Sequence, residues 1–165
     1  VDYFKEAFAF PYSDKLVKIP GLAGQGKMGK SNGEADCIYL SDTADAIRKK
    51  VMRAVSDSGP TEMNQPKPEA IQNLFDLMKV VSTPDTLQHF DELYNKCEIR
   101  YGDFKKQLAE DMVLATNDVR LRIEDISNDD AYIAKVAKLG AEKASESARK
   151  TLKEVREIIG IKRFY

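Results

Sequence analysis

The feature that most restricts the fold of this chain is the spacing of its apolar residues after residue 41, where they recur every three or four positions. This spacing places them on one face of an α-helix. Turn residues divide the pattern into five segments, so we expect five helices and no sheet of consequence in this region. The apolar positions of the segments are Ala44, Ile47, Val51 and Ala54/Val55; Ile71, Leu74, Phe75, Met78 and Val81; Leu87, Phe90, Tyr94 and Cys97; Phe104, Leu108, Met112, Ala115, Val119, Ile123 and Ile126; and Tyr132, Val136, Leu139, Ala144, Ala148, Leu152, Val155 and Ile159. The sequence therefore predicts an all-α fold, a helical bundle that follows an irregular first segment.

Capping residues predict where several of these helices begin and end. Ser41 or Asp42 is suited to begin the first helix, because a side-chain oxygen there accepts a free backbone N–H of the first turn. Residues 83–85 (Thr-Pro-Asp) predict the start of the third helix. Tyr101 and Gly102 are expected to end it.

The last two helical segments are the longest. Residues 127–130 (Ser-Asn-Asp-Asp) supply a turn with capping and first-turn acids between them, and Gly160 ends the second. Two helices of roughly 25 to 30 residues, joined by a tight turn, should pack as an antiparallel pair.

The first 40 residues carry no helical period, and their many glycine and proline residues predict loop structure. Cys37–Leu40 is a short apolar run, which fits either a strand or an extended entry to the first helix. Cys37 and Cys97 form no CxxC pair, which favours free buried thiols. No apolar run approaches the roughly 20 residues of a membrane span. The chain begins at Val1 rather than Met, which favours a truncated or processed polypeptide.

Charge is distributed unevenly along the chain. The net charge of −1 gives no general sign of a nucleic-acid binder. Residues 131–165, however, contain nine Lys and Arg against four Glu. Such a stretch is most often the solvated face of a long helix, and phosphate contacts are the alternative.

Residues 20–33 (PGLAGQGKMGKSNG) could carry chemistry. They hold five glycines, two lysines three positions apart and a serine. Glycines let backbone N–H groups turn toward oxygens, and two ammonium groups can bracket a triphosphate. The segment matches neither GxxxxGK[ST] nor GxGxxG. Composition alone therefore favours a mobile surface loop, with an anion-binding loop as the alternative.

The sequence Lys27-Met28-Gly29-Lys30-Ser31 resembles the KMSKS signature of class I aminoacyl-tRNA synthetases, and the preceding Pro-Gly-Leu-x-Gly-Gln strengthens the match. The resemblance implies that these five residues bind the phosphates of ATP, which is a substrate used with Mg²⁺. It implies that Lys27 and Lys30 stabilise the charge of the pyrophosphate leaving group and that Ser31 donates to phosphate oxygens. This would be electrostatic stabilisation of a transition state. Two departures stand out: Gly29 replaces the middle Ser, and Gly26 is an extra residue that could shift the geometry of the loop.

Four further stretches resemble the tryptophanyl-tRNA synthetase family. They are residues 47–58 with the ending Ala-Val-Ser-Asp-Ser, 67–75 (KPEAIQNLF), 101–105 (YGDFK) and 140–144 (GAEKA). The resemblance implies that residues 1–40 are the end of a catalytic Rossmann domain and that residues 41–165 are a helical anticodon-binding domain. The whole enzyme would be a cytoplasmic tryptophan--tRNA ligase, a homodimer without membrane contact, whose partners are tRNA(Trp), ATP and tryptophan. The other signature of the class, HIGH, needs two histidines, whereas this chain has only His89, so we expect His89 to be structural or exposed and the chain alone to be inactive.

The resemblance also predicts that the helices after Lys67 receive the anticodon arm of tRNA. The basic excess from Lys135 to Arg163 is then the expected backbone-contacting face. Candidates for reading bases, chosen for nearness to the turn between the long helices, are Asp118, Arg122, Asn128 and Tyr132.

Two other interpretations remain open at this stage. One is a fragment of a tyrosyl-tRNA synthetase, which shares the class and the Gly in the loop motif. The other is a non-enzymatic helical interaction module that merely follows a glycine-rich segment.

Overall fold

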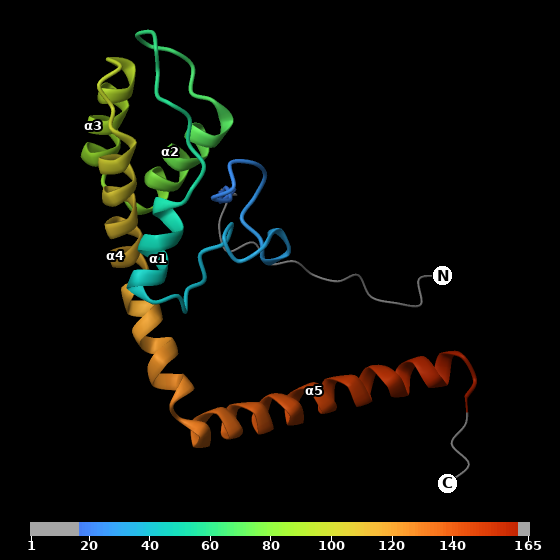
Figure 1. Ribbon diagram of the computed structural model, residues 1–165. Helices are drawn as coiled ribbons and strands as arrows, with labels where there is room; N and C mark the ends of the chain where they lie inside the picture. Colours follow the sequence, from blue (N-terminus) through green and yellow to red (C-terminus); the bar gives the residue numbers. More distant parts are fainter. Residues whose placement is uncertain (1–16, 162–165) are drawn as a thin grey trace. The chain divides into compact units, whose positions relative to one another are not determined.

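The computed structural model of the chain describes residues 17–161, and these form an all-α fold (Figure 1). Five α-helices follow one another: α1 (Ala44–Met52), α2 (Glu69–Val81), α3 (Pro84–Asn95), α4 (Tyr101–Ser127) and α5 (Asp130–Ile158). A short 3₁₀ turn, η1 (Lys30–Asn32), precedes them. Among the described residues there is no β-strand, only an isolated antiparallel bridge between Pro20 and Lys27. The predicted all-α class is confirmed, while the start of the chain and the basic residues Lys162 and Arg163 lie outside the described range.

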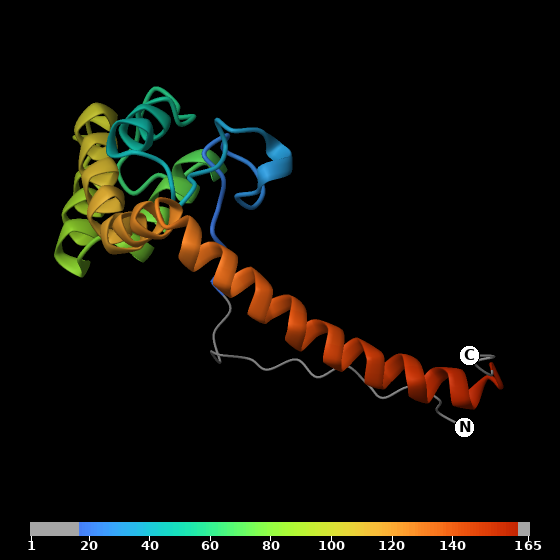
Figure 2. The ribbon, with the colours of Figure 1, turned by 90° about the horizontal axis from the view of Figure 1, so that it is seen from below.

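The chain divides into two compact units, each of which is described by itself. Residues 17–124 belong to the first, and the end of α4 with all of α5 belongs to the second. In the first unit, Figures 1 and 2 show helices α1 to α4 gathered together, with the segment that precedes α1 lying against them. The predicted antiparallel pairing of α4 and α5 spans the two units and stays a prediction.

Aromatic rings join α2, α3 and α4 in the core of the first unit. The ring of Phe75 is stacked on Phe104, with centroids 4.7 Å apart, and meets Tyr94 edge-on at 5.9 Å. Phe90 meets Phe104 edge-on at 5.2 Å. Such pairs add to the burial of apolar area that drives folding. The core also includes Leu22, Ile47, Val51, Ala54, Ile71, Leu74, Leu77, Met78, Leu108, Ala109 and Met112.

Leu22 is the residue by which the first segment enters this core. Its side chain is only 2% exposed, although it lies more than twenty residues before α1. Its backbone carbonyl accepts a hydrogen bond from the N–H of Val55, 3.1 Å away. The irregular segment is therefore packed on the helices rather than separate from them.

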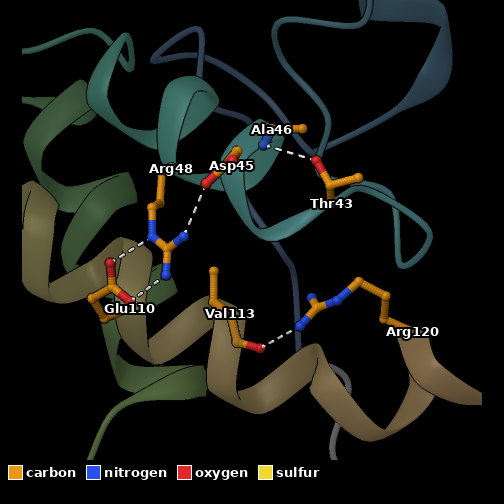
Figure 3. Close-up of polar contacts among 7 residues, drawn as sticks. All are labelled: Thr43, Asp45, Ala46, Arg48, Glu110, Val113 and Arg120. Atoms are coloured by element: carbon orange, nitrogen blue, oxygen red, sulfur yellow. Dashed lines mark hydrogen bonds and ion pairs between the residues drawn. The ribbon is translucent and has the colours of Figure 1, made fainter.

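The start of α1 differs from the prediction. Thr43, and neither Ser41 nor Asp42, is the N-cap, and its Oγ1 accepts a hydrogen bond from the N–H of Ala46 at 3.2 Å (Figure 3). Asp42 is engaged elsewhere, because its Oδ2 accepts from Lys50 Nζ at 2.6 Å. Its carboxylate is therefore committed to an ion pair and does not cap the helix.

The start of α3 follows the prediction, but its end does not. Thr83 caps the helix and Pro84 is its first residue. The helix stops at Asn95, and Tyr101 and Gly102 begin α4 instead of ending α3. The end is made by Cys97, whose φ of 58° is left-handed and whose N–H donates to the carbonyl of Tyr94. A left-handed residue after the last helical turn is a common helix terminator, although usually a glycine.

Cys97 is consequently exposed, so the predictions that it is buried and faces inward from the third helix are wrong for this residue. Cys37 is buried and free, as expected. It lies in the run Cys37–Leu40, which forms no strand and leads into a turn before α1. His89 is exposed on α3, with its ring 5.2 Å from that of Phe90, which agrees with the expected structural or exposed position.

Helix α5 begins where the turn residues indicate. Asp129 is its N-cap and accepts from the N–H of Tyr132 at 2.8 Å. Gly160 follows its end with a φ of 75°. The helix has no buried residue, and its large apolar side chains except Val155 are exposed. None of the helices formed by residues 17–161 combines the length and apolar character that a membrane span requires.

Candidate nucleotide-phosphate loop

The glycine-rich segment folds into a closed loop. The N–H of Met28 donates to the carbonyl of Ile19 at 2.8 Å, and the N–H of Gly21 donates to the carbonyl of Gly26 at 3.4 Å. These two bonds flank the bridge between Pro20 and Lys27. The residues that precede the KMSKS-like motif, 20–25, are called the leader below. The leader is thus paired with the start of the motif, and Lys27 lies at the base of the loop.

The turn between the paired segments needs glycine at two positions. Gly24 and Gly26 have φ values of 87° and 71°, in the left-handed region that side chains rarely adopt. Gly26 is the extra residue of the motif, and a Cβ on it would meet no atom within 4 Å. The left-handed backbone conformation therefore favours glycine at position 26, whereas steric crowding does not. The turn accommodates the additional residue while Lys27 keeps its pairing with Pro20.

The two lysines of the motif are exposed, and neither makes an ion pair with another residue of the range 17–161. Lys30 begins the turn η1, in which the N–H of Asn32 donates to the carbonyl of Gly29 at 3.1 Å and the N–H of Gly33 donates to that of Lys30 at 3.3 Å. Ser31 is exposed in the same turn. The ammonium groups of Lys27 and Lys30 are thus available to an anion such as a polyphosphate.

The other two motif residues behave differently from each other. Gly29 is extended, with φ −164° and ψ 145°, a conformation open to any residue. A Cβ on Gly29 would come no closer than 3.8 Å to its nearest neighbour, Ser31 Oγ, so a serine would fit there. The side chain of Met28 packs against the core, and its Sδ accepts from the N–H of Ile38 at 3.4 Å. Met28 therefore anchors the loop through its side chain, and its backbone N–H is engaged by the carbonyl of Ile19.

Asp36 is a loop residue that sequence reasoning missed. Its side chain is 2% exposed. Its Oδ1 accepts from the N–H of Ala23 at 2.7 Å, and its Oδ2 accepts from Asn32 Nδ2 at 3.0 Å. The same Nδ2 donates to the carbonyl of Lys27 at 3.0 Å. The contact with Ala23 spans 13 positions, so no local pattern indicated that this carboxylate would be buried against the start of the loop.

Lys105 is the other buried charged side chain of residues 17–161, at 7% exposure. Its Nζ donates to the carbonyl of Ala54 at 2.7 Å and to Ser56 Oγ at 2.8 Å. Burial lowers the pKa of this ammonium. Val55 lies between these two partners in the sequence, and its N–H donates to the carbonyl of Leu22. Lys105 thus fixes the stretch of backbone to which the leader of the loop is attached.

Lys50 and Lys67 are held by structural contacts. Lys50 Nζ donates to the carbonyl of Cys37 at 2.9 Å and pairs with Asp42. Lys67 Nζ lies 2.6 Å from Asp91 Oδ1 and over the rings of Phe75 and Tyr94, at 4.6 and 4.7 Å from their centroids. Both ammonium groups are already engaged, which distinguishes them from the lysines of the loop.

The residues considered for tRNA contact are exposed, and they are divided between the two units. Asp118 and Arg122 lie on α4 in the first unit, and Asn128 and Tyr132 lie in the second. The basic side chains from Lys135 to Lys153 are exposed along α5. Arg120, which the sequence did not single out, is bound to its own helix through Thr116 Oγ1, Asn117 Oδ1 and the carbonyl of Val113, the last of which is drawn in Figure 3.

Comparison with known proteins gives a consistent result. Residues 3–116 match the family described as tRNA synthetases class I (W and Y). A tryptophan--tRNA ligase of Porphyromonas gingivalis is 52% identical over 98% of this chain and 49% of its own length. One from Clostridium longisporum is 34% identical over 90% of this chain and 43% of its own length. The chain thus spans about half the length of the curated relatives that it matches.

Solved structures show the same fold. A tryptophanyl-tRNA synthetase from Campylobacter jejuni, in complex with ADP and tryptophan, has a TM-score of 0.70 over 90% of this chain and 45% of its own chain, at 23% identity. A tryptophanyl-tRNA synthetase from Mycoplasma pneumoniae has a TM-score of 0.56 over 88% of this chain and 46% of its own chain, also at 23% identity.

Proposed function

The chain belongs to the class I tRNA synthetases of the tryptophan and tyrosine family, and from this premise we propose that it is part of a tryptophan--tRNA ligase. The whole enzyme activates tryptophan with ATP and transfers it to tRNA(Trp). This part supplies a loop for the ATP phosphates and a helical domain for the anticodon. The relatives named above support the tryptophan branch over the tyrosyl alternative, since both curated ones carry that name.

The observation that carries the proposal is the contrast among the lysines. Lys50, Lys67 and Lys105 are each engaged by protein acceptors, whereas Lys27 and Lys30 are exposed and three residues apart on a closed loop. Two available ammonium groups on a positioned backbone can stabilise charge that develops on a leaving pyrophosphate. We assign this role to Lys27 and Lys30 and phosphate binding to the segment 27–31. Within it Met28, whose N–H donates to the carbonyl of Ile19, positions its neighbours.

Mg²⁺ enters this proposal only as a companion of ATP. Residues 17–161 hold no group of three or more His, Cys, Asp or Glu side chains suited to a metal ion. The contribution that we assign to Lys27 and Lys30 is cationic and needs no metal ligand from these residues.

For the rest of the chain we propose the division suggested by the resemblance. Residues 1–40 would be the end of the catalytic domain and residues 41–165 the domain that receives the anticodon arm. The exposed basic side chains of α5 would contact the RNA backbone, and Asp118, Arg122, Asn128 and Tyr132 are the candidates for base contacts. The enzyme would act in the cytoplasm as a homodimer, and the chain by itself would be inactive.

The test is tryptophan-dependent exchange of pyrophosphate into ATP by the full-length enzyme. Lys30→Ala should lower kcat by about a hundred-fold or more while the KM for tryptophan stays nearly constant, because the charge develops only on the way to the transition state. Lys106→Ala, which removes an exposed lysine of α4 outside the loop, is the matched control and should keep its activity. Equal losses in tryptophan affinity and kcat would contradict the assigned role.

The same assay separates the alternative functions. Exchange that depends on tyrosine instead of tryptophan would favour the tyrosyl assignment. A full-length protein that shows exchange with neither amino acid, and whose lysines ATP does not protect from acylation, would favour the non-enzymatic interaction module.

A further inference from the structure

We infer that Asp36 is a positioning residue for the loop that carries Lys27 and Lys30. Its carboxylate ties the start of the loop to its end and so fixes where the two lysines stand. The inference rests on the proposed function, because that function gives the lysines their partner. Asp36 itself touches neither lysine side chain in any contact of the structure, so its action is indirect.

The carboxylate of Asp36 is buried. Asp36 is 2% exposed, and residues 17–161 include no cation that pairs with it. A buried carboxylate is costly unless hydrogen bonds compensate for its lost hydration. Here the compensation comes from the loop, through the backbone N–H of Ala23 at 2.7 Å and through Asn32 Nδ2 at 3.0 Å. The loop cannot leave this arrangement without stranding the carboxylate.

Asn32 connects the carboxylate of Asp36 to the segment that carries the lysines. The Nδ2 group of Asn32 carries two hydrogens, one directed at Asp36 Oδ2 and the other at the carbonyl of Lys27, 3.0 Å away. Asn32 is also the last residue of η1, the turn that begins at Lys30. One side-chain amide therefore links Asp36 to the backbone of Lys27 and to the turn that carries Lys30.

Asp36 also lies close against the residues that precede the motif. A Cβ on Gly21 would lie 2.7 Å from Asp36 Cγ and would overlap both carboxylate oxygens. The backbone N–H of Leu22 donates to the backbone carbonyl of Asp36 at 3.2 Å. Asp36 therefore contacts the leader through its side chain and its backbone, and the leader is in turn fixed in the helical core through Leu22.

The consequence concerns the transition state more than the binding of tryptophan. Displacement of a charge-stabilising group by about 1 Å can lower a rate by about a hundred-fold. Loss of the Asp36 contacts frees Asn32 and the carbonyl of Lys27 and lets both lysines move relative to the leader. Tryptophan affinity is expected to change little, because the proposal gives this loop contact with the phosphates only.

The experiment compares Asp36→Asn with Asp42→Asn in the full-length enzyme. Both changes remove a charge from a carboxylate that accepts a backbone N–H, but the hydrogen bonds of Asp42 come from Tyr39 and Lys50 and not from residues 20–33. Asp36→Asn places an NH₂ group opposite either Ala23 N–H or Asn32 Nδ2. Pyrophosphate exchange should lose about ten-fold or more in kcat, with the KM for tryptophan within about two-fold of wild type. Asp42→Asn should lower thermal stability without this loss in kcat.

Asn32→Ala provides an independent test, because Asn32 is exposed and its truncation leaves the charge of Asp36 and its bond from the N–H of Ala23 in place. It should lower kcat as well, and the double variant should lose less than the product of the two single losses, since both act through one bridge. If Asp36→Asn and Asn32→Ala both kept kcat within about two-fold of an active wild type, the inference would be overturned while the proposed function stood. A wild-type enzyme with no tryptophan-dependent exchange would overturn the proposed function, and the inference with it.

Discussion

Arg48 on α1 forms a bidentate ion pair with Glu110 on α4, with Nε 2.7 Å from Oε1 and Nη2 2.9 Å from Oε2 (Figure 3). Arg48 Nη1 also lies 3.1 Å from Asp45 Oδ1 on its own helix. The two residues are 62 positions apart in the sequence, and their ion pair joins α1 to α4. It is exposed to solvent, so its worth must be small and sensitive to salt, although its forked geometry is favourable.

A double-mutant cycle should detect this pair. Arg48→Ala, Glu110→Ala and the double variant are expected to show a small favourable coupling in urea unfolding at low salt. Because the pair is exposed, about 1 M salt should remove most of the coupling. Coupling that is absent at low salt would mean that the contact contributes nothing to stability.

The ion pair also predicts a dependence on pH. Hydrogen bonding to Arg48 lowers the pKa of Glu110 below its ordinary value. A carboxylate with a lowered folded-state pKa stabilises the fold above its unfolded pKa, and this contribution is lost as the pH falls through the folded value. Wild type should therefore be more stable than Glu110→Gln at pH 7, and the difference should disappear toward pH 3, as measured by thermal unfolding.

Two glycines of the loop should respond oppositely to alanine. Gly26→Ala forces a side chain into a left-handed conformation and should cost about 1 to 2 kcal/mol in the free energy of unfolding. At Gly29 the backbone is extended and a Cβ has room, so Gly29→Ala should leave the free energy of unfolding unchanged or raise it slightly. Urea unfolding of the two variants compares them directly. Equal costs would show that the difference in φ is not what distinguishes these positions.

Gly29→Ser restores the usual residue of the motif and should leave catalysis nearly unchanged. A serine Cβ would have ordinary contact distances, and both lysines keep their places. Pyrophosphate exchange by the full-length variant should stay within about two-fold of wild type. A large gain or loss would mean that the residue at this position contacts the nucleotide directly.

Lys105→Met should be strongly destabilising, because it keeps the apolar stem and removes both hydrogen bonds of the ammonium. The carbonyl of Ala54 would be left without its partner, at a cost of about 1 to 3 kcal/mol. Lys106→Met, at the exposed neighbouring position, is the control and should have little effect on urea unfolding. A stable Lys105→Met variant would show that water replaces the ammonium.

The two thiols should react at very different rates. Cys97 is exposed, so a thiol reagent should modify it rapidly in the native protein. Cys37 is buried and should react only at the rate at which the fold opens. Peptide mapping after brief labelling checks this, and rapid modification of Cys37 would contradict its burial.

The helices could be predicted because the residues that determine them are close to one another in the sequence. Apolar spacing and the cap at Thr83 need only neighbours within a turn, and both are confirmed. The errors lie where a distant contact or an unusual backbone intervenes. Asp42 does not cap α1 because Lys50 engages it, and α3 ends early because Cys97 adopts a left-handed conformation without being glycine.

The candidate site was predictable only in part. Lys27 and Lys30 could be proposed because their motif is contiguous in the sequence. Asp36 and Lys105 could not, because their roles depend on contacts across 13 and 51 positions. A charged side chain carries no local sign that it will be buried, so its contribution becomes visible only when the distant partners are placed.

The burial of Leu22 has a practical consequence for preparing the helical part of this protein. A polypeptide cut at residue 41 would lack the side chain that fills the core beside α1, and the N–H of Val55 would lose its acceptor. Such a cavity typically costs about 2 to 5 kcal/mol, a large share of the stability of a small domain. A recombinant version of the first unit should therefore begin before Ile19, so that the whole loop is expressed with the helices.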